Sequence, residues 1–177
     1  MNKEFATNLK KVPISDLLAD ILIQIRKQAE SQLLTKGEVS PAIFAFSPQE
    51  SDEMKVFTYD VARLMNSSQN KEIIRMMMEE AIQSDEISLV LLVTEAWLLK
   101  LPVKDVTKEE VLKIKPSEHP DKEEVVLVNI MTKTKQFIAN AKIYRNPVSL
   151  SEFEMVSLTG ESGGTLVRDV EDTPSIH

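Results

Sequence analysis

The segment at residues 87–99, ISLVLLVTEAWLL, is the strongest apolar run of the chain and decides its fold. Successive side chains of a β-strand point to opposite faces of its sheet. Here both faces are apolar, with Ile87, Leu89, Leu91 and Val93 on one and Val90, Leu92 and Ala96 on the other. Such a strand needs cover on both sides. We therefore expect a central strand with other elements packed on each face.

Two amphipathic helices are predicted to supply this cover. After a loose leader at residues 1–13, Ser15 is a candidate N-cap, and Gly37 is expected to end the first helix. A second helix follows the polar linker at residues 66–70 and ends near Ser84, with Met76 off its apolar stripe. The two stripes are Leu18, Ile21, Leu22, Ile25 and Ala29 in the first helix, and Ile74, Met77, Met78, Ala81 and Ile82 in the second.

The remaining segments predict further strands with short connections. Residues 42–46 and 54–59 form a predicted hairpin around an acidic loop, and residues 125–131 pair with 136–145, where Asn140 belongs to an expected wet face. Residues 153–158 form a short strand. Outside the sheet we expect helical turns at 108–113. A glycine turn at 160–164 is expected to precede a final strand at 165–170, which folds back as a hairpin.

This order of elements predicts a single α+β domain over residues 1–170, followed by a disordered tail at 171–177. The sheet is expected to be mixed or antiparallel, with about five to six strands and two main helices packed on it.

Composition excludes several classes of function. The chain has 177 residues, a formal net charge of −7, no cysteine and two histidines. Thiol nucleophiles, thiolate metal sites and disulfides are therefore excluded, and we assign no metal site and no cofactor. No apolar run approaches the length of a membrane span. The acidic balance argues against nucleic-acid binding. We therefore expect a protein that binds neither membrane nor nucleic acid, and we expect it in the cytoplasm.

Glu95 is the most informative charged residue, because strand alternation places it on the apolar face beside Val93 and Trp97. A carboxylate in such a place is paired, or lies where the strand leaves the core, or serves a function. We expect a structural tie through Lys115, Lys122 or backbone N–H groups. The functional interpretation is a general acid or base in a cleft.

The loop from Pro116 to Asp121 is a second candidate site. Glu118, His119 and Asp121 offer metal-ligating or catalytic groups, and the two prolines restrict the loop's conformation. One imidazole with diverging carboxylates lacks the converging geometry of a metal site. We therefore predict that His119 is not a metal ligand.

Two segments together resemble a family of small uncharacterised bacterial proteins. Thr94-Glu95-Ala96-Trp97 is similar to the Glu-Ala-Trp strand end of that family, and residues 116–124, PSEHPDKEE, are similar to its Pro-Ser-x-x-Pro-Asp-Arg/Lys-x-Glu loop. The resemblance covers roughly residues 40–132 and departs at Lys122, where arginine is the commoner residue. It implies no activity. It implies only that the strand end and the loop belong together.

These observations favour a small cytoplasmic, non-enzymatic binding or interaction protein that forms a homodimer, with Glu95, Trp97, Glu118 and His119 as candidate ligand or interaction residues. The alternative is a metal-dependent or acid/base hydrolase that uses Glu95 and the Pro116–Asp121 loop, with Glu95, His119 and Asp121 as its candidate catalytic residues. A third hypothesis is a small-molecule pocket between the first helix and the sheet. An enclosed polar pocket at Glu95 would favour the enzyme, and an apolar cavity would favour ligand binding.

Overall fold

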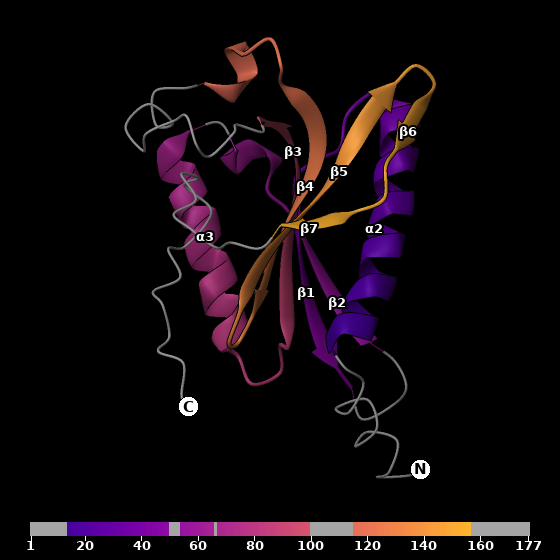
Figure 1. Cartoon of the computed structure of the whole chain (residues 1–177). Coiled ribbons are helices and arrows are strands. Elements are labelled where there is room, and N and C mark those ends of the chain that lie inside the picture. Colours follow the sequence, from indigo (N-terminus) through magenta and orange to yellow (C-terminus); the bar gives the residue numbers. More distant parts are fainter. Residues whose placement is uncertain (1–13, 50–53, 66, 100–114, 157–177) are drawn as a thin grey trace, which may run out of the picture.

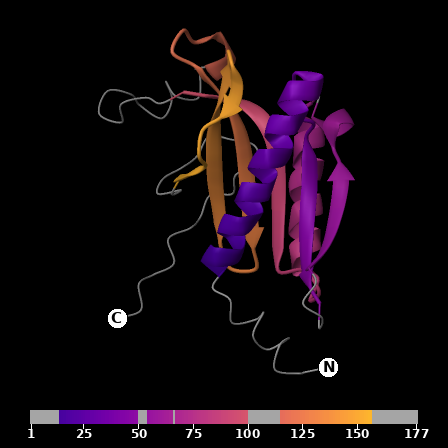
Figure 2. The same ribbon diagram turned by 90° about the vertical axis from the view of Figure 1, so that its right-hand side faces the viewer.

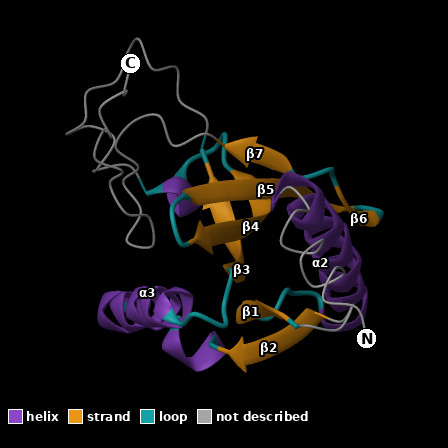
Figure 3. Ribbon diagram, turned by 90° about the horizontal axis from the view of Figure 1, so that it is seen from below, coloured by secondary structure: helices purple, strands orange, loops and turns teal. Residues whose placement is uncertain are grey.

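A computed structural model shows one curved antiparallel sheet with a helix on each face (Figures 1 and 3). It describes residues 14–49, 54–65, 67–99 and 115–156. No helix within these ranges is long and apolar enough to cross a membrane. The predicted α+β class is confirmed.

The sheet contains seven strands in the order β2-β1-β3-β4-β5-β6, and β7 also pairs with β5. All pairings are antiparallel. The bounds are β1 Ala42–Pro48, β2 Met54–Asp60, β3 Leu89–Leu98, β4 Glu123–Thr132, β5 Gln136–Arg145, β6 Val148–Leu150 and β7 Glu154–Val156.

β3 occupies the interior of the sheet, as its sequence predicts. Leu91 pairs with Phe44 of β1 on one side and with Ile130 of β4 on the other. Leu91 contributes to the core under the first helix, whereas Val90 and Leu92 contribute to the core under the second. The two apolar faces of β3 therefore belong to two separate cores.

The first helix, α2 (Ile14–Lys36), covers one face of the sheet with the predicted apolar stripe. It ends at Gly37, whose φ of +80° is a conformation that glycine adopts without a Cβ penalty. The Gly37 N–H donates to the Leu33 carbonyl at 3.1 Å, and this bond satisfies one of the last carbonyls of the helix.

The second helix, α3 (Ser68–Gln83), covers the opposite face over β1 and β3 (Figure 3). Its N-cap is Ser67, whose side chain accepts from the Asn70 N–H at 3.1 Å. Ile74, Met78 and Ile82 are buried, and Met76 is exposed, as its place off the stripe predicts.

Three features depart from the sequence prediction or fall outside it. β6 is a seventh strand that we did not predict, because three residues carry too little alternation to be recognised. Asn140 is buried instead of solvated, because it lies between β4 and β7 with Leu127 and Glu154 opposite. The predicted elements at 1–13, 108–113, 160–164 and 165–170, and the tail at 171–177, lie outside the described residues.

We expect Leu91→Ala to lower the free energy of unfolding by about 2–5 kcal/mol, because its fully buried side chain leaves a cavity under α2. Leu34→Ala is the control for the loss of leucine side-chain atoms, since Leu34 lies on α2 and is 68% exposed. Its effect should stay within about 0.5 kcal/mol. Urea denaturation measures both. If both variants lost the same free energy of unfolding, the β3 face that carries Leu91 would not belong to the core.

Candidate functional site

Glu95 lies where β3 passes the C-terminal end of α2. Its Oε1 accepts from the Val39 N–H at 2.7 Å, and its Oε2 lies 3.7 Å from Nη2 of Arg145. The Glu95 side chain is 25% exposed. A carboxylate on the apolar face is therefore compensated by a backbone donor and a guanidinium.

Arg145 connects this carboxylate to two further groups. It donates from Nε to Oε2 of Glu124 at 2.9 Å, and a second bond from Nη2 to Oε1 completes a bidentate pair. Its Nη1 donates to the Gly37 carbonyl at 2.6 Å. We call Glu95, Glu124 and Arg145, with the backbone of Gly37 and Val39, the Arg145 cluster. It joins β3, β4, β5 and the turn after α2.

The charges of the Arg145 cluster support one another electrostatically. The hydrogen bonds from Arg145 lower the pKa of Glu124, despite the opposing effect of burial. Hydrogen bonding to Glu124 raises the pKa of Arg145, and the charge of Glu95 adds to this effect. Glu124 is thereby held as a carboxylate, which suits it to a structural contact rather than to proton transfer.

The expected partners of Glu95 are only partly the observed ones. A backbone N–H is present, but the cation is Arg145, not Lys115 or Lys122. The Nζ of Lys122 instead lies 4.5 Å from the centroid of the Trp97 ring and donates to the Ser117 carbonyl. The Glu-Ala-Trp strand end and the proline loop do meet, through Lys122 and Trp97.

The proline loop includes a short 3-10 helix, η2 (Pro116–Glu118). Glu118 pairs with Lys115 at 3.0 Å, and both side chains are mostly exposed. The Asp121 N–H donates to Nδ1 of His119 at 3.1 Å. Although the Asp121 carboxylate lies 3.9 Å from the same nitrogen, an Nδ1 that accepts an N–H cannot also donate a proton to it. At 3.9 Å this contact is also longer than a hydrogen bond.

This geometry does not assemble the candidate residues into one reactive centre. In the described ranges, no hydrogen bond or ion pair joins Glu95 to Glu118, His119 or Asp121. The same ranges hold no group of three or more His, Asp or Glu placed to bind a metal ion. Nδ1 of His119 already accepts from the Asp121 N–H, so a metal ion at this nitrogen would have to displace that hydrogen bond.

A groove of about 870 Å³ runs between α2 and the strands at the β5–β7 end of the sheet. Its floor includes the buried Leu18 and Leu22, and Ile23 and Met155 on its walls are about half exposed. We call it the α2 groove, and its lining residues are Leu18, Ala19, Leu22, Ile23, Arg26, Lys27, Glu30, Phe137, Glu152, Phe153 and Met155.

Charged residues of the α2 groove fix one of its walls. Arg26 donates to Glu152 at 2.9 Å and to the Leu150 carbonyl at 3.0 Å, and it lies 3.5 Å from Glu30. Glu30 accepts from the Leu150 N–H at 3.0 Å. Lys27 has no hydrogen-bond or ion-pair partner among the residues that the structure describes.

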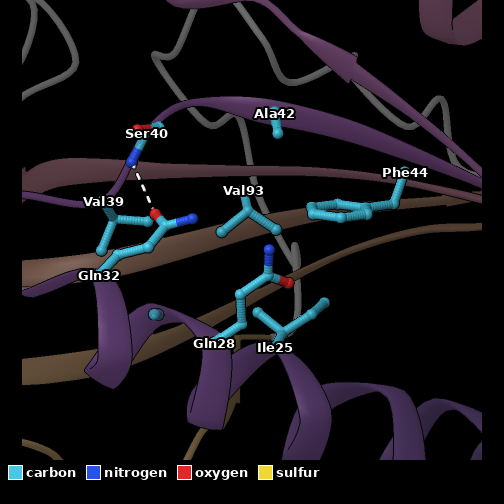
Figure 4. A pocket seen from close by; sticks show the side chains of 9 residues that line it. Ile25, Gln28, Gln32, Val39, Ser40, Ala42, Phe44 and Val93 are labelled. Atoms are coloured by element: carbon cyan, nitrogen blue, oxygen red, sulfur yellow. Dashed lines mark hydrogen bonds between the residues drawn. The ribbon is translucent and has the colours of Figure 1, made fainter.

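A second cavity under α2, of about 20 Å³, is shown in Figure 4. It lies between the helix and strands β1 and β3, with Gln28 and Gln32 on the helix side. The Gln32 side chain accepts from the Ser40 N–H at 2.9 Å. A space of this size holds about one water molecule. It fits hydration of the two amides and is too small for an organic ligand.

Sequence reasoning missed the Arg145 cluster and the outer wall of the α2 groove. Arg145 stands at the end of a strand with an ordinary polar pattern, so nothing local marks it as the partner of a glutamate fifty residues earlier in the chain. Ile23 did carry a signal, because it is an apolar residue outside the stripe of α2. Comparison with protein-family models, with curated proteins and with solved structures gave no match to this chain.

We expect Glu95→Gln to lower the free energy of unfolding by about 1–3 kcal/mol, because the amide keeps an acceptor for Val39 but loses the charge that faces Arg145. Glu118→Gln is the control, since its pair with Lys115 is exposed and contributes little. Urea unfolding of both variants measures the difference. An unchanged midpoint and slope for Glu95→Gln would remove the structural role.

The lowered pKa of Glu124 predicts a specific loss of stability in acid. A depressed pKa stabilises the fold above the ordinary glutamate pKa of about 4.3, and this contribution disappears as the pH falls through the folded-state value. The stability difference between the native protein and Arg145→Met should therefore be largest near neutral pH and shrink in acid. Urea midpoints across this pH range measure it. A difference that does not change with pH would contradict the pairing.

Proposed function

We propose that the protein binds a ligand with an elongated apolar body and an anionic head, such as a fatty acid, in the α2 groove. The observation that carries the proposal is the groove itself, with a volume of about 870 Å³. Sites for small molecules are typically ~300–1,000 Å³, with mainly apolar linings and a few polar groups. The α2 groove meets both criteria.

The exposed apolar side chains on the groove walls support this proposal. Ile23 and Met155 are 51% and 47% exposed, and they flank a floor that is continuous with the core. A ligand that covers them removes apolar area from water, which is the main favourable term in such binding. An extended hydrocarbon chain fits a groove between a helix and a strand.

Lys27 supports an anionic head group. The other charged groups of the lining, Arg26, Glu30 and Glu152, interact with one another or with the backbone of Leu150. Lys27 has no such interaction within the described part of the chain. A carboxylate at the polar rim would pair with it, while the hydrocarbon chain lies along Ile23 and Met155.

The alternative hydrolase has less support. Its proposed acid or base, Glu95, is engaged by the Val39 N–H and by Arg145, and neither cavity under or beside α2 is lined by Glu95. A catalytic base needs an accessible proton acceptor next to a space for substrate. We also propose a cytoplasmic location, which comes from the sequence and not from the groove.

Binding is tested by displacement of the fluorescent probe 1-anilinonaphthalene-8-sulfonate with dodecanoate. We expect dodecanoate to bind and Ile23→Glu to weaken it by at least about tenfold, because the variant introduces a carboxylate beside the hydrocarbon chain. Leu34→Glu is the matched control, since Leu34 is exposed on the same helix but does not line the groove. The affinity of Leu34→Glu for dodecanoate should equal that of the native protein.

The contribution of the head group is measured separately with Lys27→Met. This variant should weaken dodecanoate and leave dodecanol, which has no charge, unaffected. Failure of dodecanoate to bind the native protein would contradict the proposed ligand class. Equal weakening by Ile23→Glu and Leu34→Glu would contradict the proposed site.

A further inference from the structure

The two lateral edges of the sheet differ in how they are protected. An exposed edge strand offers unpaired N–H and C=O groups to another strand, and proteins block this with short strands, prolines or covering side chains. The β6 edge has such protection: the strand has three residues and follows Pro147. In addition, Arg26 and Glu30 from α2 bind the carbonyl and N–H of Leu150.

Among the described residues, the β2 edge has no proline, no shortened strand and no side chain from another element bound to its backbone. The strand Met54–Asp60 has seven residues without proline or glycine, and it pairs only with β1 in the described part of the chain. Figure 2 shows β2 at one side of the sheet with no described element beyond it. Val56 and Tyr59 are 45% and 48% exposed. The Nζ of Lys55 lies 4.8 Å from the Phe57 ring centroid. The charge of Lys55 is therefore directed to a side chain of its own strand and not across the edge.

We infer that β2 pairs with β2 of a second copy of the chain, which makes one continuous antiparallel sheet across a homodimer. The inference is independent of the ligand proposed for the α2 groove. Identical edge strands can pair antiparallel about a twofold axis perpendicular to the sheet. In such a pair, if residue i of one copy faces residue j of the other, then residue j of the first copy faces residue i of the second. Both copies then keep α2 on the same side of the joined sheet.

The sequence of β2 is self-complementary in the register centred on Phe57. This register pairs the whole strand, whereas shifted registers leave residues at both ends unpaired. It places Val56 opposite Thr58 of the other copy and Tyr59 opposite the aliphatic stem of Lys55. No like charges face each other, because Asp60 lies opposite Met54. The exposed Val56 and Tyr59 would thereby be covered.

Sedimentation velocity of the full chain over micromolar concentrations tests the dimer. We expect a reversible dimer for the native protein and a monomer for Val56→Lys/Thr58→Lys, because the register places the introduced lysines opposite one another twice. Both positions are exposed, so circular dichroism and the melting temperature should show an intact fold. A native protein that stays monomeric at every concentration, or a double-lysine variant that stays dimeric, would overturn the inference.

The charge-paired variant Val56→Lys/Thr58→Glu is the matched control. In the register centred on Phe57, each lysine faces a glutamate, so the dimer should persist. A register centred on position 56 would oppose the two lysines, and one centred on position 58 would oppose the two glutamates. A monomeric charge-paired variant would therefore overturn this register. Ile23→Glu in the α2 groove should leave the dimer intact, and its dissociation would place the interface at the groove instead.

Discussion

Neither face of β3 can be exposed to solvent, and this constraint determines the arrangement of the two helices. Its alternate residues enter different cores, with Leu91 under α2 and Leu92 on the side of α3. Removing either helix would leave a row of aliphatic side chains in water, at a cost of about 25 cal/mol for each Å² exposed. The three-layer order of helix, sheet and helix is therefore the arrangement that buries both faces of β3.

Helix α2 covers only part of the length of β3, and the Arg145 cluster lies at the point where the helix ends. α2 stops at Gly37, while β3 continues through Glu95 and Trp97. Turning the chain after the helix leaves backbone polar groups near an apolar face, and such groups need partners. Glu95 supplies an acceptor to Val39, and Arg145 supplies a donor to Gly37. The charged residues thus secure the turn that brings the chain from α2 into β1.

Sequence predicted the features that depend on local repetition. Helices α2 and α3, the central strand and the β1–β2 and β4–β5 hairpins follow from periods of 3.6 and 2, and the end of α2 follows from Gly37. The position of Glu95 on an apolar face was predictable, as was its need for a partner. The identity of the partner was not, because Arg145 reaches it only through the pairing of β3, β4 and β5. Nor does any period predict β6, or the wall that Met155 contributes to the α2 groove.

The diagonal course of α2 links the groove to the protected edge of the sheet. Arg26 and Glu30 hold the backbone of Leu150, and the same two side chains line the α2 groove. The chain after Leu150 returns along β5 as β7, and this return places Phe153 and Met155 across from Ile23. Contacts that close one edge against further strands therefore also build the groove wall. Among the described residues, the sheet has a closed edge beside the groove and an unpaired edge at β2. The proposed ligand site and the proposed strand pairing therefore lie at opposite edges of the sheet.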